Sequence, residues 1–189
     1  MLRAMVLEFP DDPACDYLDL QYMLGDSLLV APVFNEDGSV RFYVPEGKWT
    51  NLLNGEVVEG PRWIKETHDF LSLPLLVRPN SIIPIGKHDD RPDYEYSDGL
   101  TLQVYQLQDG KHSSVEIPSL DGTIQTRFDF NRDGQEIQAA RQGPALPWTI
   151  LLVGIREVEA VQDMETETVA GGTLIKVPAG IESLTLRIK

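Results

Sequence analysis

The sequence predicts a mainly β protein, in which two antiparallel β-sandwich domains follow a short β/α unit. Three observations predict this class. Apolar and polar residues alternate with a period of two from Leu28 onward, which is typical of half-buried strands. Turn-forming Gly, Pro, Asn and Asp residues separate these runs at short intervals. The polar, proline-bearing stretch 87–93 divides the β-rich part in two and indicates a domain linker.

Length and charge limit the functions that fit. The 189 residues are enough for two small domains with a core each, and no stretch approaches the roughly 20 apolar residues of a membrane span. Lys and Arg total 16 against 30 Asp and Glu, which gives a formal net charge of −14. This charge repels phosphate backbones and anionic membrane surfaces. We therefore expect neither nucleic acid nor membrane as a partner.

The single cysteine, Cys15, has no partner for an internal disulfide bond. The N-terminal run 1–9 contains Arg3 and Glu8 and lacks a small-residue cleavage site, so it does not resemble a signal peptide. Both features suit a reducing compartment. We therefore expect a cytoplasmic protein.

The β/α unit is expected at residues 1–24. The run 1–9 predicts a strand that is buried on both faces, because its large apolar side chains are interrupted by only one cation and one anion. Asp12 offers an N-cap carboxylate and Pro13 suits the first helical position, so a helix is expected from there to Leu24. The strand needs neighbours for its backbone N–H and C=O groups, so this unit cannot stand alone.

The first sandwich is expected over residues 25–86. Gly25 ends the helix, and the continuous apolar run that starts at Leu28 predicts a buried strand. Asn54-Gly55 is the strongest hairpin signal in the chain, because both central residues of a type I′ turn need a positive φ. Three prolines restrict the last strands to sheet edges or short lengths. These prolines are Pro74, Pro79 and Pro84.

The second sandwich is expected over residues 87–189. Asp-Gly pairs begin at positions 98, 109, 121 and 133, and these intervals of 11, 12 and 12 residues match the turn spacing of a sandwich. Strands are expected at 100–104, 115–117, 124–130, 148–153, 158–161, 173–177 and 184–188.

Three aspartates are the first candidates for catalysis, because glycoside hydrolysis needs two facing carboxyl groups and barrel enzymes carry them on the loops that follow strands. These residues are Asp11, Asp12 and Asp16. The structural alternative is that Asp12 caps the helix while its acidic neighbours favour the positive end of the helix dipole. We favour this alternative and assign no catalytic residue.

No metal ion or cofactor is expected. The three histidines lie 20 and 24 residues apart without ligand spacing, and the serines lack a Gly-x-Ser-x-Gly motif. Neither a P-loop nor a dinucleotide-binding fingerprint occurs. The histidines are His68, His88 and His112, and the serines considered are Ser114, Ser119 and Ser183.

Aromatic residues support an alternative function as a carbohydrate-binding module, because sugar rings stack on exposed aromatic rings. Trp63 is the candidate substrate-binding residue, since its neighbours Pro61, Arg62 and Lys65 suggest a partly exposed position near a loop. Most tryptophans in sandwiches belong to the core, which is the competing interpretation. The other aromatic candidates are Trp49, Trp148, Tyr94, Tyr96 and Tyr105.

Four segments carry a resemblance to a known family. They are RAMVLEFPDDP at 3–13, QYMLGDSLLVAPV at 21–33, YVPEGKWT at 43–50 and VRPNSIIP at 77–84. The first two segments, in this order, are specific. Through them the chain resembles the C-terminal end of family 31 glycoside hydrolases, and bacterial α-xylosidases in particular.

The resemblance implies a parent enzyme with a (β/α)8 catalytic barrel that retains configuration by means of two aspartates. Residues 1–24 would then be a remnant of that barrel, its last strand and helix, with 25–86 the proximal and 87–189 the distal C-terminal β-sandwich. The family's Trp-x-Asp-Met-Asn-Glu nucleophile motif does not occur in this sequence. We therefore expect a chain that is inactive alone and has the missing N-terminal and barrel domains as partners.

Two further expectations concern the N-terminal segment. The apolar residues of 1–9 would lose their natural covering outside the barrel, so they would pack on the proximal sandwich or on another copy of the chain. Self-association is therefore a possible outcome. A third function, a small hydrolase in its own right, would depend on Asp11 or Asp16.

Overall fold

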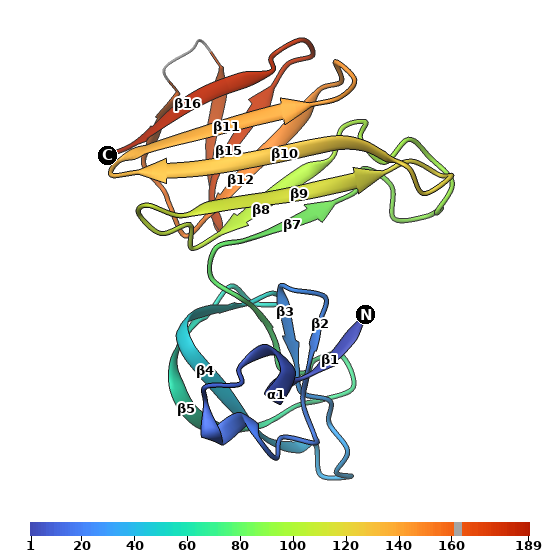
Figure 1. The fold of residues 1–189 in the computed structure, drawn as a ribbon, viewed down its shortest axis with the longest axis vertical. Coiled ribbons are helices and arrows are strands. Elements are labelled where there is room, and N and C mark those ends of the chain that lie inside the picture. Colours follow the sequence, from blue (N-terminus) through green and yellow to red (C-terminus); the bar gives the residue numbers. More distant parts are fainter. Residues whose placement is uncertain (161–163) are drawn as a thin grey trace. The chain divides into compact units, whose positions relative to one another are not determined.

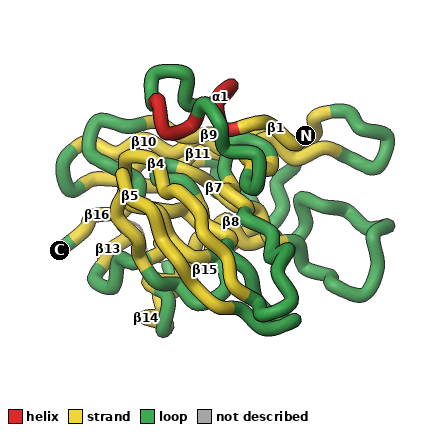
Figure 2. The backbone as a smooth tube through the Cα atoms, turned by 90° about the horizontal axis from the view of Figure 1, so that it is seen from below, coloured by secondary structure: helices red, strands yellow, loops and turns green. Residues whose placement is uncertain are grey.

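A computed structural model describes residues 1–160 and 164–189, which divide into a first unit, Met1–Pro79, and a second unit, Asn80–Lys189 (Figure 1). Strands and loops make up nearly all of the described chain (Figure 2). The helical residues described are α1 (Met5–Glu8) and the 3-10 turn η1 (Pro13–Cys15), both in the N-terminal segment. None of the described helices has the length and apolar character to cross a membrane. The mainly β class is confirmed.

The described strands of the first unit form one antiparallel sheet in the order β1-β2-β3-β6-β4-β5. Its two longest strands, β4 and β5, form the hairpin expected at Asn54-Gly55, and Gly55 has the positive φ of +77° that this turn requires. The strands are β1 (Leu2–Ala4), β2 (Tyr22–Leu24), β3 (Leu28–Val30), β4 (Ser39–Asn51), β5 (Val57–Thr67) and β6 (Leu75–Val77).

The structure corrects the β/α unit expected at residues 1–24. The strand expected over 1–9 ends at Ala4, where one turn of helix directs Met5 into the core and leaves Leu7 exposed. The helix expected as far as Leu24 is only the turn η1, because Tyr22–Leu24 is hydrogen-bonded on both sides as strand β2. Backbone partners far along the chain override the helical spacing of the side chains here. No β/α unit is evident.

The first unit has its own core beneath this sheet. Trp49 is fully buried, and its indole Nε1 donates a hydrogen bond to the carbonyl oxygen of Pro45 at 3.0 Å. Met5 and Cys15 from the N-terminal segment pack into the same cluster, so this segment belongs to the unit as an integral part. The largest other members are Met23, Leu29, Phe42, Tyr43 and Leu76.

The second unit is a sandwich of two five-stranded sheets within the described residues. Their orders are β13-β16-β11-β10-β9 and β14-β15-β12-β8-β7, and β8 and β12 run parallel. The strands are β7 (Ser81–Ile85), β8 (Thr101–Tyr105), β9 (His112–Pro118), β10 (Ile124–Asp133), β11 (Glu136–Gln142), β12 (Trp148–Val153), β13 (Val158–Ala160), β14 (Glu165–Val169), β15 (Gly172–Val177) and β16 (Ser183–Ile188).

One strand of this sandwich differs from the expectation, and one residue of an expected strand lies outside the described part of the chain. Strand β7, which the sequence placed in the first sandwich, is hydrogen-bonded to β8 of the second unit. Its apolar run Ile82-Ile83 therefore finds its partner downstream of the polar stretch 87–93 and not upstream of it. Val161, the expected end of a strand over 158–161, lies outside the described residues.

The core of the sandwich is centred on Trp148. Its ring lies 4.8 Å from that of Phe128 and 6.4 Å from that of Phe130, centroid to centroid. These residues come from both sheets, so the core holds the two layers together. The expected Asp-Gly turns are present, since Gly99, Gly110, Gly122 and Gly134 all have a positive φ.

Candidate functional site

The aspartates of the N-terminal segment support local structure. Both carboxylate oxygens of Asp12 are engaged, because Oδ1 accepts the backbone N–H of Ala14 at 3.0 Å and Oδ2 accepts the Tyr43 hydroxyl at 2.7 Å. Asp12 is therefore the N-cap of η1, as the structural alternative supposed. Asp11 and Asp16 are exposed on either side of it.

Asp11 and Asp12 line a groove of about 570 Å³ together with two further acids, Glu8 and Glu46. Glu8 forms ion pairs with Arg3 and Arg78, and the latter guanidinium also lies over the Phe9 ring at 5.0 Å. Glu8 is thus neutralised by cations, while Asp12 is held by hydrogen bonds. The other lining residues are Phe9, Pro10, Pro13, Tyr43, Pro45 and Pro61.

Two weak acids next to this groove resist ionisation. Burial raises the pKa of the Tyr43 hydroxyl to about 12, and its hydrogen bond to the Asp12 carboxylate adds to the shift. Burial likewise raises the pKa of the Cys15 thiol to about 11, with further contributions from Asp12 and Asp16. Both side chains stay protonated at neutral pH, so neither supplies a nucleophile or a base there.

Trp63, the candidate sugar-stacking residue, lies on β5 with 47% of its surface exposed. The Arg41 guanidinium lies over its ring, 4.7 Å from the centroid, and the Tyr43 ring packs at 5.6 Å with an interplanar angle of 54°. The exposed part of the ring is thus flanked by a cation and by the Tyr43 ring beside the acidic groove.

The other aromatic candidates are placed differently. Trp49, Trp148 and Tyr105 are buried, so they offer no surface to a ligand. Tyr94 packs edge-on against His88 at 5.0 Å and against Tyr96 at 5.1 Å, in the loop before β8. Tyr94 and Tyr96 belong to the second unit, whereas Trp63 belongs to the first.

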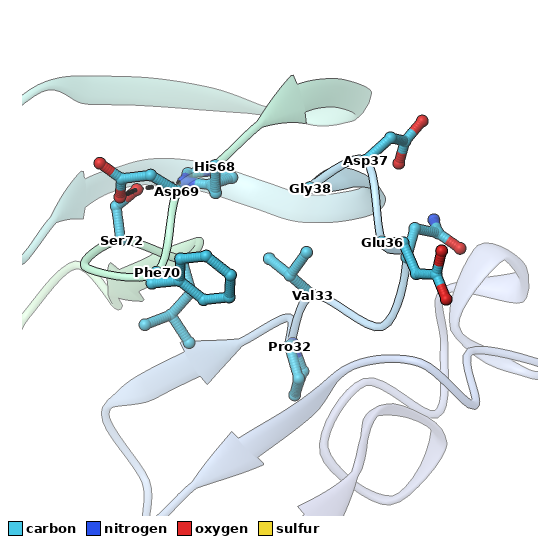
Figure 3. Close-up of a pocket in the computed structure, with 11 residues that line it drawn as sticks. Pro32, Val33, Glu36, Asp37, Gly38, His68, Asp69, Phe70 and Ser72 are labelled. Carbon is cyan, nitrogen blue, oxygen red and sulfur yellow. Dashed lines mark hydrogen bonds between the residues drawn. The ribbon is translucent and has the colours of Figure 1, made fainter.

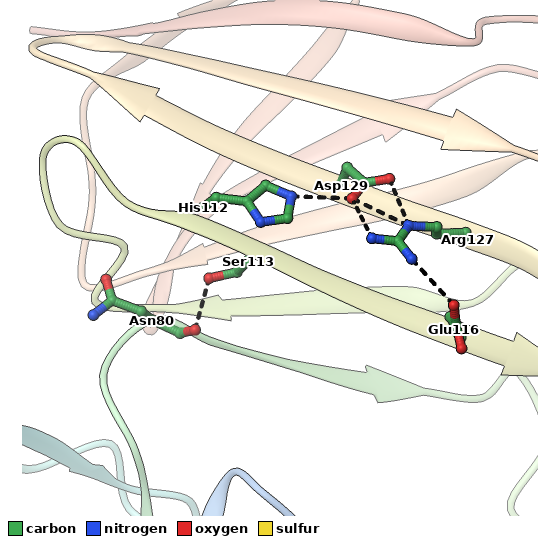
Figure 4. A network of polar contacts seen from close by, with 6 residues as sticks. All are labelled: Asn80, His112, Ser113, Glu116, Arg127 and Asp129. Carbon is green, nitrogen blue, oxygen red and sulfur yellow. Dashed lines mark hydrogen bonds and ion pairs between the residues drawn. The ribbon is translucent and has the colours of Figure 1, made fainter.

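The three histidines occupy three separate environments. His88 pairs with Asp90 at 3.8 Å, and His112 pairs with Asp129 at 3.0 Å beside Arg127, whose hydrogen bonds lower the pKa of Asp129 (Figure 4). No cluster of three or more His, Cys, Asp or Glu side chains suited to a metal ion occurs among the residues that the structure describes.

The serines considered from the sequence are not arranged as a triad. Ser119 bonds to Thr123 and Asp121 within a turn, Ser114 is exposed on β9, and Ser183 begins β16. Their neighbour Ser113 donates to the backbone carbonyl of Asn80 at 2.7 Å, so it too has a structural contact (Figure 4).

A feature that sequence reasoning missed lies at the end of β5. His68 Nε2 is 2.9 Å from Glu66 Oε2. His68 Nδ1 is 3.1 Å from Ser72 Oγ, which itself donates to Asp69 Oδ1 at 2.9 Å (Figure 3). Both ring nitrogens of His68 thus lie within hydrogen-bond distance of a side-chain oxygen. The Glu-x-His-Asp spacing at 66–69 was the available signal, but it is short and common.

His68, Asp69 and Ser72 border a pocket of about 640 Å³ between the loops 31–38 and 68–74. Figure 3 shows Phe70 and Val33 on its apolar side and Glu36 and Asp37 at its acidic rim. Hydrogen bonds from Ser39 lower the pKa of Asp37, which keeps that rim negative. The remaining lining residues are Pro32, Asn35, Gly38 and Leu73.

Two family models match the chain in succession. One describes the glycosyl hydrolase family 31 C-terminal domain and matches residues 1–83. The other describes the C-terminal domain of the alpha-xylosidase YicI and matches residues 95–188.

The curated relatives are much longer than the chain. It is 44% identical over 117 residues to the alpha-xylosidase XylQ of Lactiplantibacillus pentosus, with 60% of this chain and 15% of that protein covered. An alpha-xylosidase of Emericella nidulans is 45% identical over 62% of this chain and 16% of that protein. An alpha-glucosidase of Saccharolobus solfataricus is 38% identical over 45% of this chain and 12% of that protein.

Solved structures show the same fold within larger chains. A family 31 dextranase of Flavobacterium johnsoniae matches all of this chain with a TM-score of 0.76 and 21% identity, over 29% of its own length. A cycloalternan-forming enzyme of Listeria monocytogenes matches all of it with a TM-score of 0.79 and 24% identity, over 20% of its own length. The arrangement of the two units' strands thus recurs in proteins several times longer.

Proposed function

Because this chain belongs to glycoside hydrolase family 31 and consists of C-terminal β domains of that family, we propose that it is the non-catalytic C-terminal part of an α-xylosidase-like enzyme. The parent enzyme would retain configuration and hydrolyse terminal α-xylosyl or α-glucosyl residues in carbohydrate metabolism. The α-xylosidase names of two relatives, at 44% and 45% identity, favour xylose over glucose.

The observation that carries the proposal is the pair of family models, which between them account for residues 1–83 and 95–188 as C-terminal domains. The acidic groove agrees with a supporting role, since Asp12 and Glu8 are occupied by structural partners. In this proposal the catalytic aspartates lie in the barrel of the parent enzyme. The first unit supports that barrel, and the second unit contributes packing or subunit contacts.

Hydrolysis assays test the absence of catalysis. The purified chain should release no nitrophenol from nitrophenyl α-xyloside or α-glucoside, at any concentration that gives a measurable rate with the complete enzyme. Asp11→Asn and Asp16→Asn are the matched variants. Release by the wild-type chain that either substitution abolishes would show a local active site and contradict the proposal.

A truncation tests the supporting role. The complete enzyme shortened by the length of this chain should be less soluble and lose activity faster on warming. Full activity and an unchanged melting temperature after truncation would exclude structural support by these domains.

A carbohydrate-binding module is the second candidate, favoured by the half-exposed ring of Trp63. Titration with xylose, xylo-oligosaccharides and malto-oligosaccharides distinguishes the two functions. A platform gives a saturable change in tryptophan fluorescence that Trp63→Ala removes, whereas a supporting domain gives none. The buried residues Trp49 and Trp148 remain in both proteins and supply the reference signal.

A further inference from the structure

Exposed apolar side chains are concentrated on the first unit. Among the described residues, 16 large hydrophobic side chains are exposed, and 13 of them belong to Met1–Pro79. The second unit, although longer, contributes only Ile85, Leu120 and Ile124. Contiguous exposed apolar surface marks interaction sites in soluble proteins, so the first unit is where a partner is expected.

Two strongly exposed side chains, including the most exposed one, are adjacent at the tip of the loop 68–74. Phe70 is 107% and Leu71 is 91% exposed, so each projects as far as it would from an extended chain. Phe70 also lines the pocket of about 640 Å³ described above, next to Val33 (Figure 3). The loop thus presents two exposed apolar side chains beside the apolar side of the pocket.

Hydrogen bonds hold this tip in place. Asp69 Oδ1 accepts the backbone N–H of Leu71 at 3.0 Å and the Ser72 hydroxyl at 2.9 Å. Each histidine ring nitrogen of His68 has a side-chain partner, and its backbone N–H donates to the Gly38 carbonyl at 3.0 Å. A preorganised loop loses little conformational entropy when its apolar side chains become buried in an interface.

We propose that the Phe70–Leu71 tip and the adjacent pocket form the surface on which the first unit docks against the barrel-bearing part of its own parent chain. This inference rests on the proposed function and adds the residues through which support is delivered. The occupant follows from length, since the chain spans only 15–16% of the two α-xylosidases it resembles, and its first family model is that of a C-terminal domain.

The charge of the rim specifies the chemistry of the partner surface. Glu36, Asp37 and Asp69 border the pocket, and the whole chain carries a formal net charge of −14. The opposing surface should therefore combine an apolar centre, into which Phe70 and Leu71 insert, with Lys or Arg side chains at its edge. A second copy of this chain would bring like charge against like and is the less complementary occupant.

The test uses the double variant Phe70→Ser/Leu71→Ser in the complete enzyme. We expect its half-life of activity at a temperature near the melting point to fall at least fivefold, because two central anchors of the interface are lost. The matched control is Leu120→Ser/Ile124→Ser, which removes two exposed apolar side chains from the second unit and should leave the half-life unchanged.

The isolated chain separates docking from folding. Since Phe70 and Leu71 are fully exposed in the chain, the double variant should not lower the melting temperature of the isolated chain. Glu36→Lys should weaken docking in the complete enzyme, with an effect that fades at high salt, whereas Glu157→Lys on the second unit should not. Both glutamates are exposed.

Three outcomes overturn the inference. The first is that the double variant leaves the half-life of the complete enzyme unchanged. The second is that the double variant destabilises the isolated chain, which would mean that Phe70 and Leu71 act in folding. A concentration-dependent dimer of the isolated chain that the double variant dissociates, with the complete enzyme unaffected, would identify a second copy as the occupant. If truncation destabilises the enzyme and the double variant does not, the docking surface is wrong while the proposed function stands.

Discussion

The side chain of Gln21 forms hydrogen bonds with the backbone of β4, as a neighbouring strand would. Its side-chain Nε2 donates to the Tyr43 carbonyl at 2.8 Å, and its Oε1 accepts the Tyr43 backbone N–H at 2.7 Å. Gln21 is only 5% exposed, so these hydrogen bonds are shielded from water. One amide side chain thus satisfies both backbone groups of a core residue in the middle of a long strand.

We predict that Gln21→Leu lowers the free energy of unfolding of the first unit by roughly 2–4 kcal/mol, because two buried backbone groups lose their partners. Chemical denaturation measures this change. Gln138→Leu, at an exposed position on β11, is the control and should change the free energy by less than about 0.5 kcal/mol. Equal effects of the two substitutions would contradict this role of Gln21.

The raised pKa values of Cys15 and Tyr43 predict a loss of stability in alkali. Their pKa values rise from 9.0 to about 11 and from 10.0 to about 12, so the unfolded chain releases these protons first. Stability is therefore fully present below pH 9 and decreases as the pH rises from about 9 to 12, at about 1.4 kcal/mol per pH unit for each group in its window.

Denaturation at several pH values measures this dependence. Cys15→Ala should remove the earlier part of the decrease, and Tyr43→Phe the later part, although it also loses the hydrogen bond to Asp12. If the free energy of unfolding falls with the same slope between pH 9 and 11 in both variants and in the wild type, these two groups do not cause the fall.

The sequence predicted the short-range contact of Asp12 but not the long-range contacts of Tyr43. The cap at Asp12 was predictable because its hydrogen bond reaches Ala14, two residues away. The contacts of Tyr43 with Asp12 and Gln21 span 31 and 22 residues, and no local pattern encodes them. The exposed position of Trp63 was predicted, but the Arg41 guanidinium over its ring was not.

At the scale of elements, the turn before β4 is tightly fitted against the end of β5. Gly38 has a φ of +73°, and a Cβ atom built on it would lie 2.2 Å from the His68 carbonyl oxygen. We predict that Gly38→Ala lowers the free energy of unfolding by roughly 2–4 kcal/mol, through left-handed strain plus a backbone clash.

Gly55→Ala isolates the strain from the clash. Its φ is +77°, yet a Cβ atom there would meet nothing within 4 Å, so the loss should be only about 1 kcal/mol. Urea denaturation of the two variants gives the comparison. If Gly38→Ala lowers the free energy of unfolding by no more than Gly55→Ala does, the turn before β4 and the end of β5 must separate more easily than the structure indicates.

Elements with local signals were predicted well, and those fixed by distant pairing were not. The β4–β5 hairpin follows from Asn54-Gly55, since the turn itself dictates the pairing of its flanks. Residues 22–24 have helical spacing as well as apolar character, and only their hydrogen bonds to β1 and β3 decide for a strand. Short apolar runs of this kind are ambiguous between helix and strand.

For the whole molecule, two separate cores predict two unfolding transitions. Leu29 belongs to the core of the first unit and Leu152 to that of the second, and both are fully buried. Each Leu→Ala substitution costs roughly 2–5 kcal/mol and should lower the melting temperature of its own transition by roughly 10 °C or more.

Differential scanning calorimetry resolves the transitions. Leu29→Ala should shift one heat-absorption peak and Leu152→Ala the other. A single peak that both substitutions lower equally would mean that the units unfold together, in spite of their separate cores.

The polar stretch 87–93 predicted a division into two β-rich parts, but not to which part each strand belongs. Strand β7 precedes this stretch and still pairs with β8, which follows it. Strands β8 and β12 pair in parallel although the paired residues Thr101 and Thr149 lie 48 positions apart in the chain. Such pairings depend on the complete sandwich, so periodicity within a segment does not reveal them.

The position of β16 has a consequence for how the protein is made. This late strand is not at an edge, because it lies between β13 and β11 and contributes Leu184 and Leu186 to the core. The ribosome must therefore release residues through Ile188 before the second unit can close, whereas the first unit is complete at Pro79. During translation the nascent second unit exposes an unfinished sheet until β16 pairs with β11 and β13.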